Sequence, residues 1–278
     1  MPESWEEIIA SSPGQYAVDC RVLGTPVTLK HRSDTAVESA STIKLIILLT
    51  LLDAAQHRQI SLRKATSLNR TQVGRNGSGI LQSMYFNAPF TLYNLAYLMM
   101  AVSDNVATNA IIELLTKAEI NHFAAENLGL KHTKLVMDRL DFPAAYNMQV
   151  GPHLGLTTAS EMSTVLERLL RGDLLNQHYT RLALRLMCDV QRSTFNRRLQ
   201  NASIKRFGSK TGWIDDQHSK TAVLNECGFI ETKAGKLFVF SVFSISPLDP
   251  ELPYSHDAPA RIEFAQLSRA LFSALQKN

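Results

Sequence analysis

Long hydrophobic runs and paired cysteines are both missing from this 278-residue chain. The most apolar stretch, residues 45–52, is far shorter than the ~20 residues that a helix needs to span a bilayer. It predicts a helix buried in a protein core, and we expect no membrane partner. The three cysteines are far apart and form no Cys-x-x-Cys pair. This spacing excludes a disulfide framework or a zinc site and predicts buried free thiols.

Charge of one sign is not concentrated in any segment either. The net charge is +4 and the 29 basic residues are scattered, so we expect no nucleic-acid partner. The eight histidines show no His-x-His or His-Glu-x-x-His spacing, which indicates neither a metal nor another cofactor. Because no Gly-x-Ser-x-Gly occurs, the nucleophile elbow of α/β-hydrolases is excluded as a source of serine chemistry.

The N-terminal stretch MPESWEEIIASS is acidic and lacks the basic start and apolar centre of an export signal. We therefore expect a cytoplasmic protein if this N-terminus is native, and a secreted or periplasmic one if the chain has been trimmed. With 45% apolar residues, the chain has the composition of an ordinary globular protein. Its length suits one sizeable domain.

Strand-like segments lie at the two ends of the chain, and helical patterns lie between them. This order predicts an α+β fold, in which a sheet assembled from both ends carries an inserted helical lobe and the active cleft lies between the two. We expect a single domain, 1–278, with an α/β lobe of about 1–40 and 201–278 and an all-helical lobe of about 41–200. The expected strands are 15–23, 26–31, 204–213, 221–231 and 236–246, and the expected terminal helices are 3–10 and 258–276.

A serine and a lysine stand three residues apart at the start of the most apolar helix. Residues three apart share a helix face, so Lys44 would stand one turn above Ser41. Low solvent access would lower the pKa of the lysine, so that its neutral amine could act as a base. The N–H groups at the end of the helix could bind an oxyanion. A helix N-cap is the alternative role for Ser41. A second Ser-x-x-Lys, at Ser61 and Lys64, reads as a surface turn.

Two further motifs follow in order: Ser103-Asp104-Asn105 and Lys210-Thr211-Gly212. Together with Ser41-x-x-Lys44, they resemble the active-site set of class A β-lactamases and penicillin-binding proteins. Segments 77–81, 99–109 and 157–162 are also similar to family segments. The resemblance covers most of residues 15–275. It implies an antiparallel five-stranded sheet flanked by terminal helices, plus the inserted helical lobe.

The resemblance also implies roles for the matching residues. Ser41 would be the nucleophile and Lys44 its proton acceptor, while Ser103 would relay a proton to the leaving nitrogen. Asn105 would hydrogen-bond the substrate amide and the lysine. The oxyanion would lie between the backbone N–H groups of Ser41 and Trp213. A polar helix-cap turn is the alternative for the Ser-Asp-Asn motif.

Cationic residues near the third motif would recognise a substrate carboxylate. Lys210 would supply positive charge and Thr211 a hydrogen bond, although a lysine that guards an exposed strand edge is the alternative. Lys220 lies about where the family often carries an arginine for the same carboxylate. A solvated lysine that precedes a strand is the alternative for Lys220.

One segment departs from the family pattern. Class A enzymes place a glutamate two residues after an arginine here, followed shortly by an asparagine, and the pair positions the water that hydrolyses the acyl-enzyme. Arg139 matches, but Asp141 stands at the glutamate's place and Asn147 comes later than expected. We expect a reshaped loop in which Asp141 either serves as the deacylating group or only caps a turn.

The leading hypothesis is a monomeric serine hydrolase for a small molecule, in which β-lactams acylate Ser41 and hydrolyse slowly from it. The first alternative is a penicillin-binding-like D-alanyl peptidase, or an esterase, acting on another small amide or ester. The second is a non-catalytic binding protein, which the reactive residues in all three motifs disfavour.

Overall fold

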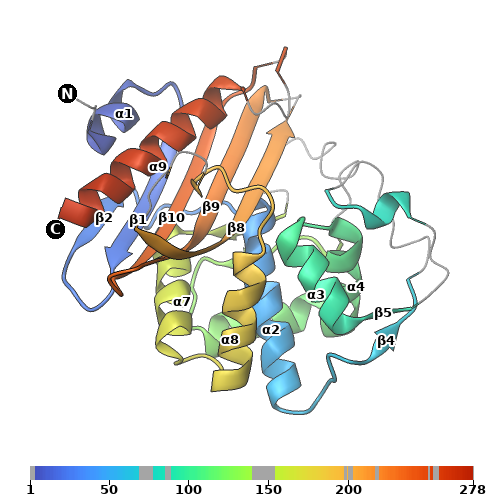
Figure 1. Ribbon diagram of the computed structural model, residues 1–278. Coiled ribbons are helices and arrows are strands. Elements are labelled where there is room, and N and C mark those ends of the chain that lie inside the picture. Colours follow the sequence, from blue (N-terminus) through green and yellow to red (C-terminus); the bar gives the residue numbers. More distant parts are fainter. Residues whose placement is uncertain are drawn as a thin grey trace.

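The computed structural model describes residues 4–68, 78–84, 89–139, 154–196, 199, 203–216, 219–249, 251–252 and 257–277. Its centre is a five-stranded antiparallel sheet built from the two ends of the chain (Figure 1). The strand order is β2-β1-β10-β9-β8, which leaves β8 at one edge. The strands are β1 (Gln15–Val22), β2 (Thr28–His31), β8 (Ile204–Asp216), β9 (Thr221–Thr232) and β10 (Leu237–Pro247).

The three central strands are buried on both faces, because helices cover both sides of the sheet (Figure 1). The short helix α1 (Trp5–Ser11) and the long helix α9 (Pro259–Lys277) lie on one face. Glu263 of α9 ties the two layers together, since it accepts hydrogen bonds from the hydroxyls of Ser12 and Tyr16. The other face packs against the helical lobe.

Helix α2 (Lys44–Gln56) runs through the middle of that lobe and is buried on nearly every side. A single 3₁₀ turn, η1 (Ala40–Ile43), leads into it. The helices packed around it are α3 (Leu92–Ala101), α4 (Asn105–Leu115), α5 (Lys117–His122), the π-helical turn η4 (Phe123–Asn127), α7 (Ala159–Arg171) and α8 (Gln177–Cys188).

The α+β fold and the five strands are confirmed, and β8 continues three residues beyond its expected end. The inserted lobe differs from expectation, because it also contains two small sheets. One has the order β3-β7-β6 and the other pairs β4 with β5. Each of these strands has only two or three residues, too few for an alternating pattern to show. They are β3 (Val37–Glu38), β4 (Ala65–Thr66), β5 (Phe90–Thr91), β6 (Lys134–Leu135) and β7 (Gly155–Thr157).

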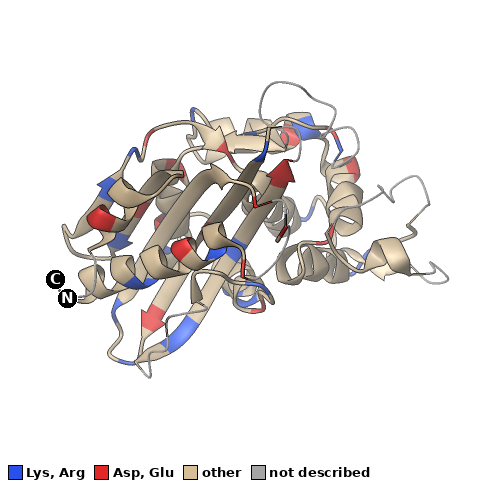
Figure 2. Ribbon diagram, turned by 90° about the horizontal axis from the view of Figure 1, so that it is seen from above, with Lys and Arg blue, Asp and Glu red and all other residues tan. Residues whose placement is uncertain are grey.

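Basic and acidic residues are interspersed over the ribbon seen from above, with no broad face of one sign among the described residues (Figure 2). Within that part of the chain, no helix is both long and apolar enough to cross a membrane. Ser61 lies in an exposed turn, as the sequence predicts, where its carbonyl accepts a hydrogen bond from the Lys64 N–H.

Candidate active site

Ser41 and Lys44 lie at the junction of η1 and α2. A 3₁₀ turn has three residues per turn, so side chains three apart are eclipsed and Lys44 stands directly over Ser41. Ser41 is 6% exposed and Lys44 is fully buried. The sequence therefore places a serine at the rim of the core and a buried lysine one turn further along the same side.

The Lys44 ammonium group connects this turn to the Ser-Asp-Asn motif. Its Nζ lies 2.6 Å from Asn105 Oδ1, 2.8 Å from the Ser103 carbonyl oxygen and 3.1 Å from Ser103 Oγ. The amide nitrogen of Asn105 is buried without a hydrogen-bond partner among the described residues. One end of this amide thus orients the lysine, while its donor end stays available.

Asp104, between these two residues, builds the local structure that presents them. Its buried carboxylate caps α4 by accepting from the Ala107 N–H (3.0 Å). It also accepts from the N–H groups of Ile80 (2.7 Å) and Leu81 (2.9 Å). Gly79 has a φ of +107°, and a Cβ there would lie 2.2 Å from the same carboxylate, so only glycine fits.

Lys210 reaches the cluster from the sheet. It lies in the edge strand β8, is fully buried, and its Nζ lies 3.1 Å from Ser103 Oγ and 2.7 Å from the Thr211 carbonyl oxygen. The Ser103 hydroxyl therefore stands between the amines of Lys44 and Lys210. It can accept a hydrogen bond from a protonated lysine while it donates to a neutral one.

Strand β8 touches the serine turn at Gly212. A Cβ on this residue would lie 3.0 Å from the Ala40 Cβ, from the Ser39 carbonyl oxygen and from the Ser41 backbone nitrogen. A glycine therefore allows the two backbones to approach closely. The next residue along the strand is Trp213, so its backbone lies one residue from this contact.

Strained backbone occurs at two of these positions. Ala40 has a φ of +45° and Ser103 a φ of +57°, and neither is a glycine. Ala40 immediately precedes the first motif, and Ser103 is the first residue of the second. Such conformations cost on the order of 1–3 kcal/mol each, and they gather at functional sites.

Burial lowers the pKa of both lysines. Desolvation, with the charge of Lys210 nearby, holds the pKa of Lys44 well below its ordinary value of 10.5, and Asp104 only partly opposes this. Burial also lowers the pKa of Lys210, to about 8, against the opposing influence of Cys227 and Glu226. Burial therefore favours the neutral form of both lysines, whose amines share the Ser103 hydroxyl.

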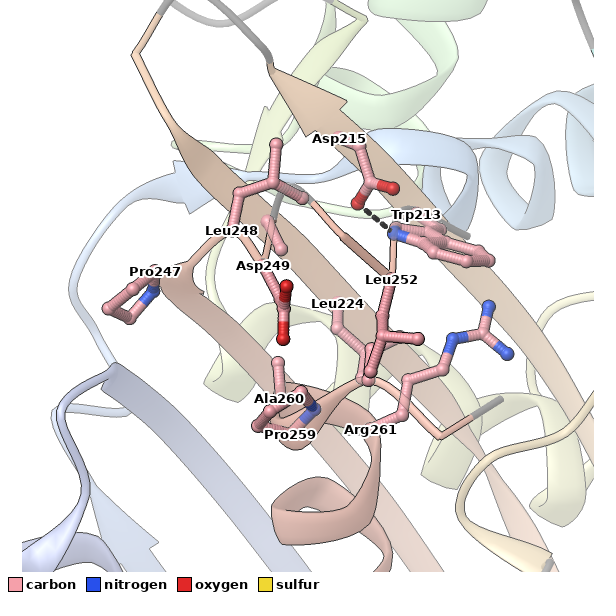
Figure 3. Close-up of a pocket in the computed structure, with 12 residues that line it drawn as sticks. Trp213, Asp215, Leu224, Pro247, Leu248, Asp249, Leu252, Pro259, Ala260 and Arg261 are labelled. Atoms are coloured by element: carbon pink, nitrogen blue, oxygen red, sulfur yellow. Dashed lines mark hydrogen bonds between the residues drawn. The ribbon is translucent and has the colours of Figure 1, made fainter. Parts of the chain in front are cut away.

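Beyond Trp213 the sheet borders two hollows that share Arg261. The Arg261 guanidinium lies 3.5 Å from the centre of the Trp213 ring, and the indole N–H donates to Asp215 (Figure 3). The apolar pocket drawn in Figure 3 holds about 20 Å³, room for little more than a water molecule. The second hollow, of about 450 Å³, is lined by Val190, Gln191, Arg192, Ser193, Thr194, Asn196, Asp257 and Arg261.

The structure does not bring every candidate residue to this cluster. Lys220 is exposed at the far end of the β8–β9 hairpin, next to the Asp216–Thr221 pair. Asp216 is five residues from Thr211, or about 17 Å along a strand. Asp141 and Asn147 lie outside the described residues. Within the described part of the chain, no three His, Cys, Asp or Glu side chains are grouped to hold a metal ion.

Sequence reasoning overlooked Glu226 and Arg261. Glu226 had a signal, because it is a glutamate in the middle of the β-rich segment TAVLNECGFIET. Arg261 had none, since an arginine in the first turns of an amphipathic helix is ordinary. Asp104 was noticed only as part of its motif, without its capping role.

The chain matches the model of the Beta-lactamase enzyme family over residues 3–275 and belongs to that family. Among curated proteins, no sequence matches it. The family and the fold together make it a serine hydrolase of the β-lactamase and penicillin-binding-protein type, which acts on small molecules.

Solved structures share the fold over nearly their whole length. A β-lactamase from Sphaerobacter thermophilus is 24% identical, with a TM-score of 0.83 and coverage of 99% of this chain and 96% of that one. A mutant of PBP-A in an acyl-enzyme complex with penicillin G is 21% identical (TM-score 0.81; 99% and 95%). The extended-spectrum β-lactamase TLA-3 is 17% identical (TM-score 0.84; 98% and 96%). At these identities the likeness concerns the fold.

Proposed function

We propose that Ser41 is the nucleophile of this hydrolase and that it is acylated by the amide carbonyl of a β-lactam. The observation that carries the proposal is the position of Lys44, fully buried, one 3₁₀ turn from Ser41 and bonded to Ser103 and Asn105. Burial lowers the pKa of Lys44, which favours the neutral amine that can accept the serine proton.

In the first step, the Ser41 Oγ attacks the carbonyl carbon while its proton passes to Lys44. The negative charge that forms on the carbonyl oxygen is stabilised by the N–H groups of Ser41 and Trp213, near the close approach at Gly212. When the carbon–nitrogen bond breaks, the leaving nitrogen takes a proton through the Ser103 hydroxyl. The product of this step is an ester on Ser41.

The carboxylate of the substrate is bound by the sheet half of the site. Lys210 and the Thr211 hydroxyl supply the charge and one hydrogen bond. Lys220 lies at the exposed end of the hairpin, beside the Asp216–Thr221 pair. Arg261 and Arg192, which line the 450 Å³ hollow beyond Trp213, supply the additional positive charge instead.

Hydrolysis of the ester needs a group that positions a water molecule, and we assign it to Asp141. An aspartate is one methylene shorter than the family's glutamate, which misplaces its carboxylate by on the order of 1 Å and can slow such a step about 10²-fold. Deacylation is then slower than acylation, and an acyl-enzyme accumulates. PBP-A, whose mutant was solved as an acyl-enzyme with penicillin G, offers a precedent within the fold.

Mass spectrometry of the intact protein after mixing with benzylpenicillin tests this function. We expect an adduct of one penicillin on the wild-type chain, located on Ser41 by peptide mapping, and none on Ser41→Ala. Ser61→Ala, in the exposed second copy of the motif, is the matched control and should react like the wild type. An adduct that survives in Ser41→Ala contradicts the proposal.

The decay of that adduct separates the two candidate activities. Slow loss with release of penicilloate indicates a β-lactamase with poor deacylation, and a stable adduct indicates a penicillin-binding-like peptidase. The departure at Asp141 and Asn147 is the observation that favours this second candidate.

A further inference from the structure

Glu226 of β9 is a fully buried carboxylate that the reaction above does not use. Its two oxygens accept four hydrogen bonds. The hydroxyls of Ser193 and Ser209 each donate to Oε1 at 2.6 Å. The backbone N–H groups of Thr194 and Phe195 each donate to Oε2 at 2.9 Å.

This arrangement suits the ionised form of Glu226. Each oxygen already accepts two hydrogen bonds, so a carboxyl proton would have to displace a donor. The pKa of Glu226 is raised by burial, and the hydrogen bonds from the Ser193 and Ser209 hydroxyls and from the two N–H groups oppose this in part. An ionised carboxylate is expensive to bury, and a set of four donors is what compensates for the lost water.

On one side, the hydrogen bonds of Glu226 reach the strand that carries the third motif. Ser209 immediately precedes Lys210, and Glu226 is paired in register with Thr211. Directly opposed residues of an antiparallel pair share a face of the sheet, so Glu226 lies beside Thr211. Glu226 thus accepts a hydrogen bond from the residue before Lys210 and is paired in register with the residue after it.

On the other side, the hydrogen bonds of Glu226 hold residues 193–195, which form part of the wall of the 450 Å³ hollow. Ser193 and Thr194 line this hollow, and the Phe195 ring stacks on Phe240 of the sheet, with ring centres 3.7 Å apart. Gln191, two residues before Ser193, donates from its backbone N–H to the Ala101 carbonyl oxygen at 2.9 Å. Ala101 lies two residues before the Ser-Asp-Asn motif. This stretch thus connects the sheet with the helical lobe.

We propose that Glu226 is a positioning residue of this site, which fixes the 193–195 wall and the strand around Lys210 in one arrangement and keeps Lys210 positively charged. The proposal rests on the proposed function only in so far as Lys210 binds a substrate carboxylate. Glu226 itself touches neither the substrate nor the reacting atoms.

The charge effect depends on the groups that surround Lys210. Lys44 of the helical lobe shares the Ser103 hydroxyl with Lys210, and Asp104 raises the pKa of Lys44. From β9, Cys227 and Glu226 raise the pKa of Lys210. Arg192 and Arg261 border the segment that Glu226 holds. Because burial already brings the pKa of Lys210 to about 8, removal of the Glu226 charge should lower it further.

The test compares Glu226→Gln with the wild type, using benzylpenicillin and its methyl ester across pH 6–9. A fall of one unit in the pKa of Lys210 would leave about a tenth of it charged at pH 8, where the wild type has about half. We expect acylation by benzylpenicillin at pH 8 to slow about 5-fold or more. The alkaline fall in its pH–rate profile should begin at a lower pH than in the wild type. The methyl ester should change less than about 2-fold.

Glu161→Gln is the matched control. Glu161 of α7 also accepts four hydrogen bonds, from the N–H groups of Lys131, His132 and Thr133 and from the Thr133 hydroxyl, but it holds a different segment of the chain. This variant should lose stability without any change in the pH profile or in the preference between the two substrates. Equal losses on both substrates in Glu226→Gln would overturn the proposal.

A titration of ¹³C-labelled lysines by NMR keeps the test independent of catalysis. The Lys210 midpoint should fall in Glu226→Gln and stay in place in Ser193→Ala, which removes one hydrogen bond and no charge. Ser193→Ala should instead raise the KM for benzylpenicillin while kcat is retained. An unchanged Lys210 midpoint in Glu226→Gln overturns the proposal, whereas a wild type that benzylpenicillin never acylates overturns only the proposed function.

Discussion

The helical half and the sheet half of this site each contribute one buried lysine, and the two lysines have different surroundings. Burial and the charge of Lys210 hold the pKa of Lys44 well below its ordinary value, and Asp104 opposes this. Lys210 has Glu226 and Cys227 nearby, and its pKa falls only to about 8. The difference teaches that burial alone does not decide whether a lysine acts as a base or as a cation; the neighbouring charges do.

Removal of the base should have the largest effect. Lys44→Met keeps the volume of the side chain but cannot accept the serine proton, so acylation should slow by about 10²-fold or more. Benzylpenicillin and its methyl ester should be affected alike, because both need the same nucleophile. Stopped-flow or quenched-flow mass spectrometry measures the two rates. A loss confined to benzylpenicillin would show that Lys44 acts on the carboxylate.

Removal of the cation should act on one class of substrate. Lys210→Met deletes a charge-assisted hydrogen bond worth ~1.5–3 kcal/mol, so kcat/KM for benzylpenicillin should fall by about 10- to 10²-fold. The methyl ester should be spared. Lys220→Met, at the exposed end of the hairpin, is the matched control and should leave both substrates unchanged. If both substrates lose equally in Lys210→Met, the role of Lys210 is structural.

The contact between the two halves can be tested at Gly212. The methyl group of Gly212→Ala would lie 3.0 Å from the Ser41 backbone nitrogen and the Ser39 carbonyl oxygen, so β8 and η1 must move apart by a few tenths of an ångström. Because both donors to the oxyanion then shift, we expect about a 10-fold loss of acylation for both substrates. Unchanged rates would mean that the close approach has no part in catalysis.

Arg261 should show the smallest effect. Arg261→Lys keeps a positive charge but loses the planar group that lies over Trp213, and a few-fold rise in KM for benzylpenicillin is expected. Steady-state kinetics with benzylpenicillin and the methyl ester measure the change. A rise of KM for the ester as well would indicate that Arg261 acts by supporting the Trp213 backbone.

Much of this arrangement was predictable from the sequence, since short motifs encode local geometry. Ser41 and Lys44 are three residues apart, and Ser103-Asp104-Asn105 begins a helix whose cap is visible in the sequence. The sheet followed from β-rich segments at both ends of the chain. The pairing partner of each strand residue is a tertiary property, however. The sequence does not show that Lys220 lies beside the Asp216–Thr221 pair at the end of the β8–β9 hairpin.

Long-range contacts account for what was overlooked. The role of Glu226 depends on the 193–195 segment, some thirty residues earlier, and that of Arg261 on Trp213, some fifty residues earlier. Neither has a fixed spacing that a sequence pattern could capture. The two small sheets in the helical lobe were missed because strands of two or three residues carry no periodicity.

The division between the two lysines is tested most directly by an NMR titration of ¹³C-labelled lysine side chains in the wild type, with Lys44→Met and Lys210→Met for assignment. The account predicts that Lys210 titrates near pH 8 and that Lys44 is still neutral well below that pH. The acylation rate for benzylpenicillin should therefore fall as the pH rises through 8, while that for the methyl ester should not. A Lys44 that titrates above Lys210, near the ordinary value of 10.5, would contradict the account.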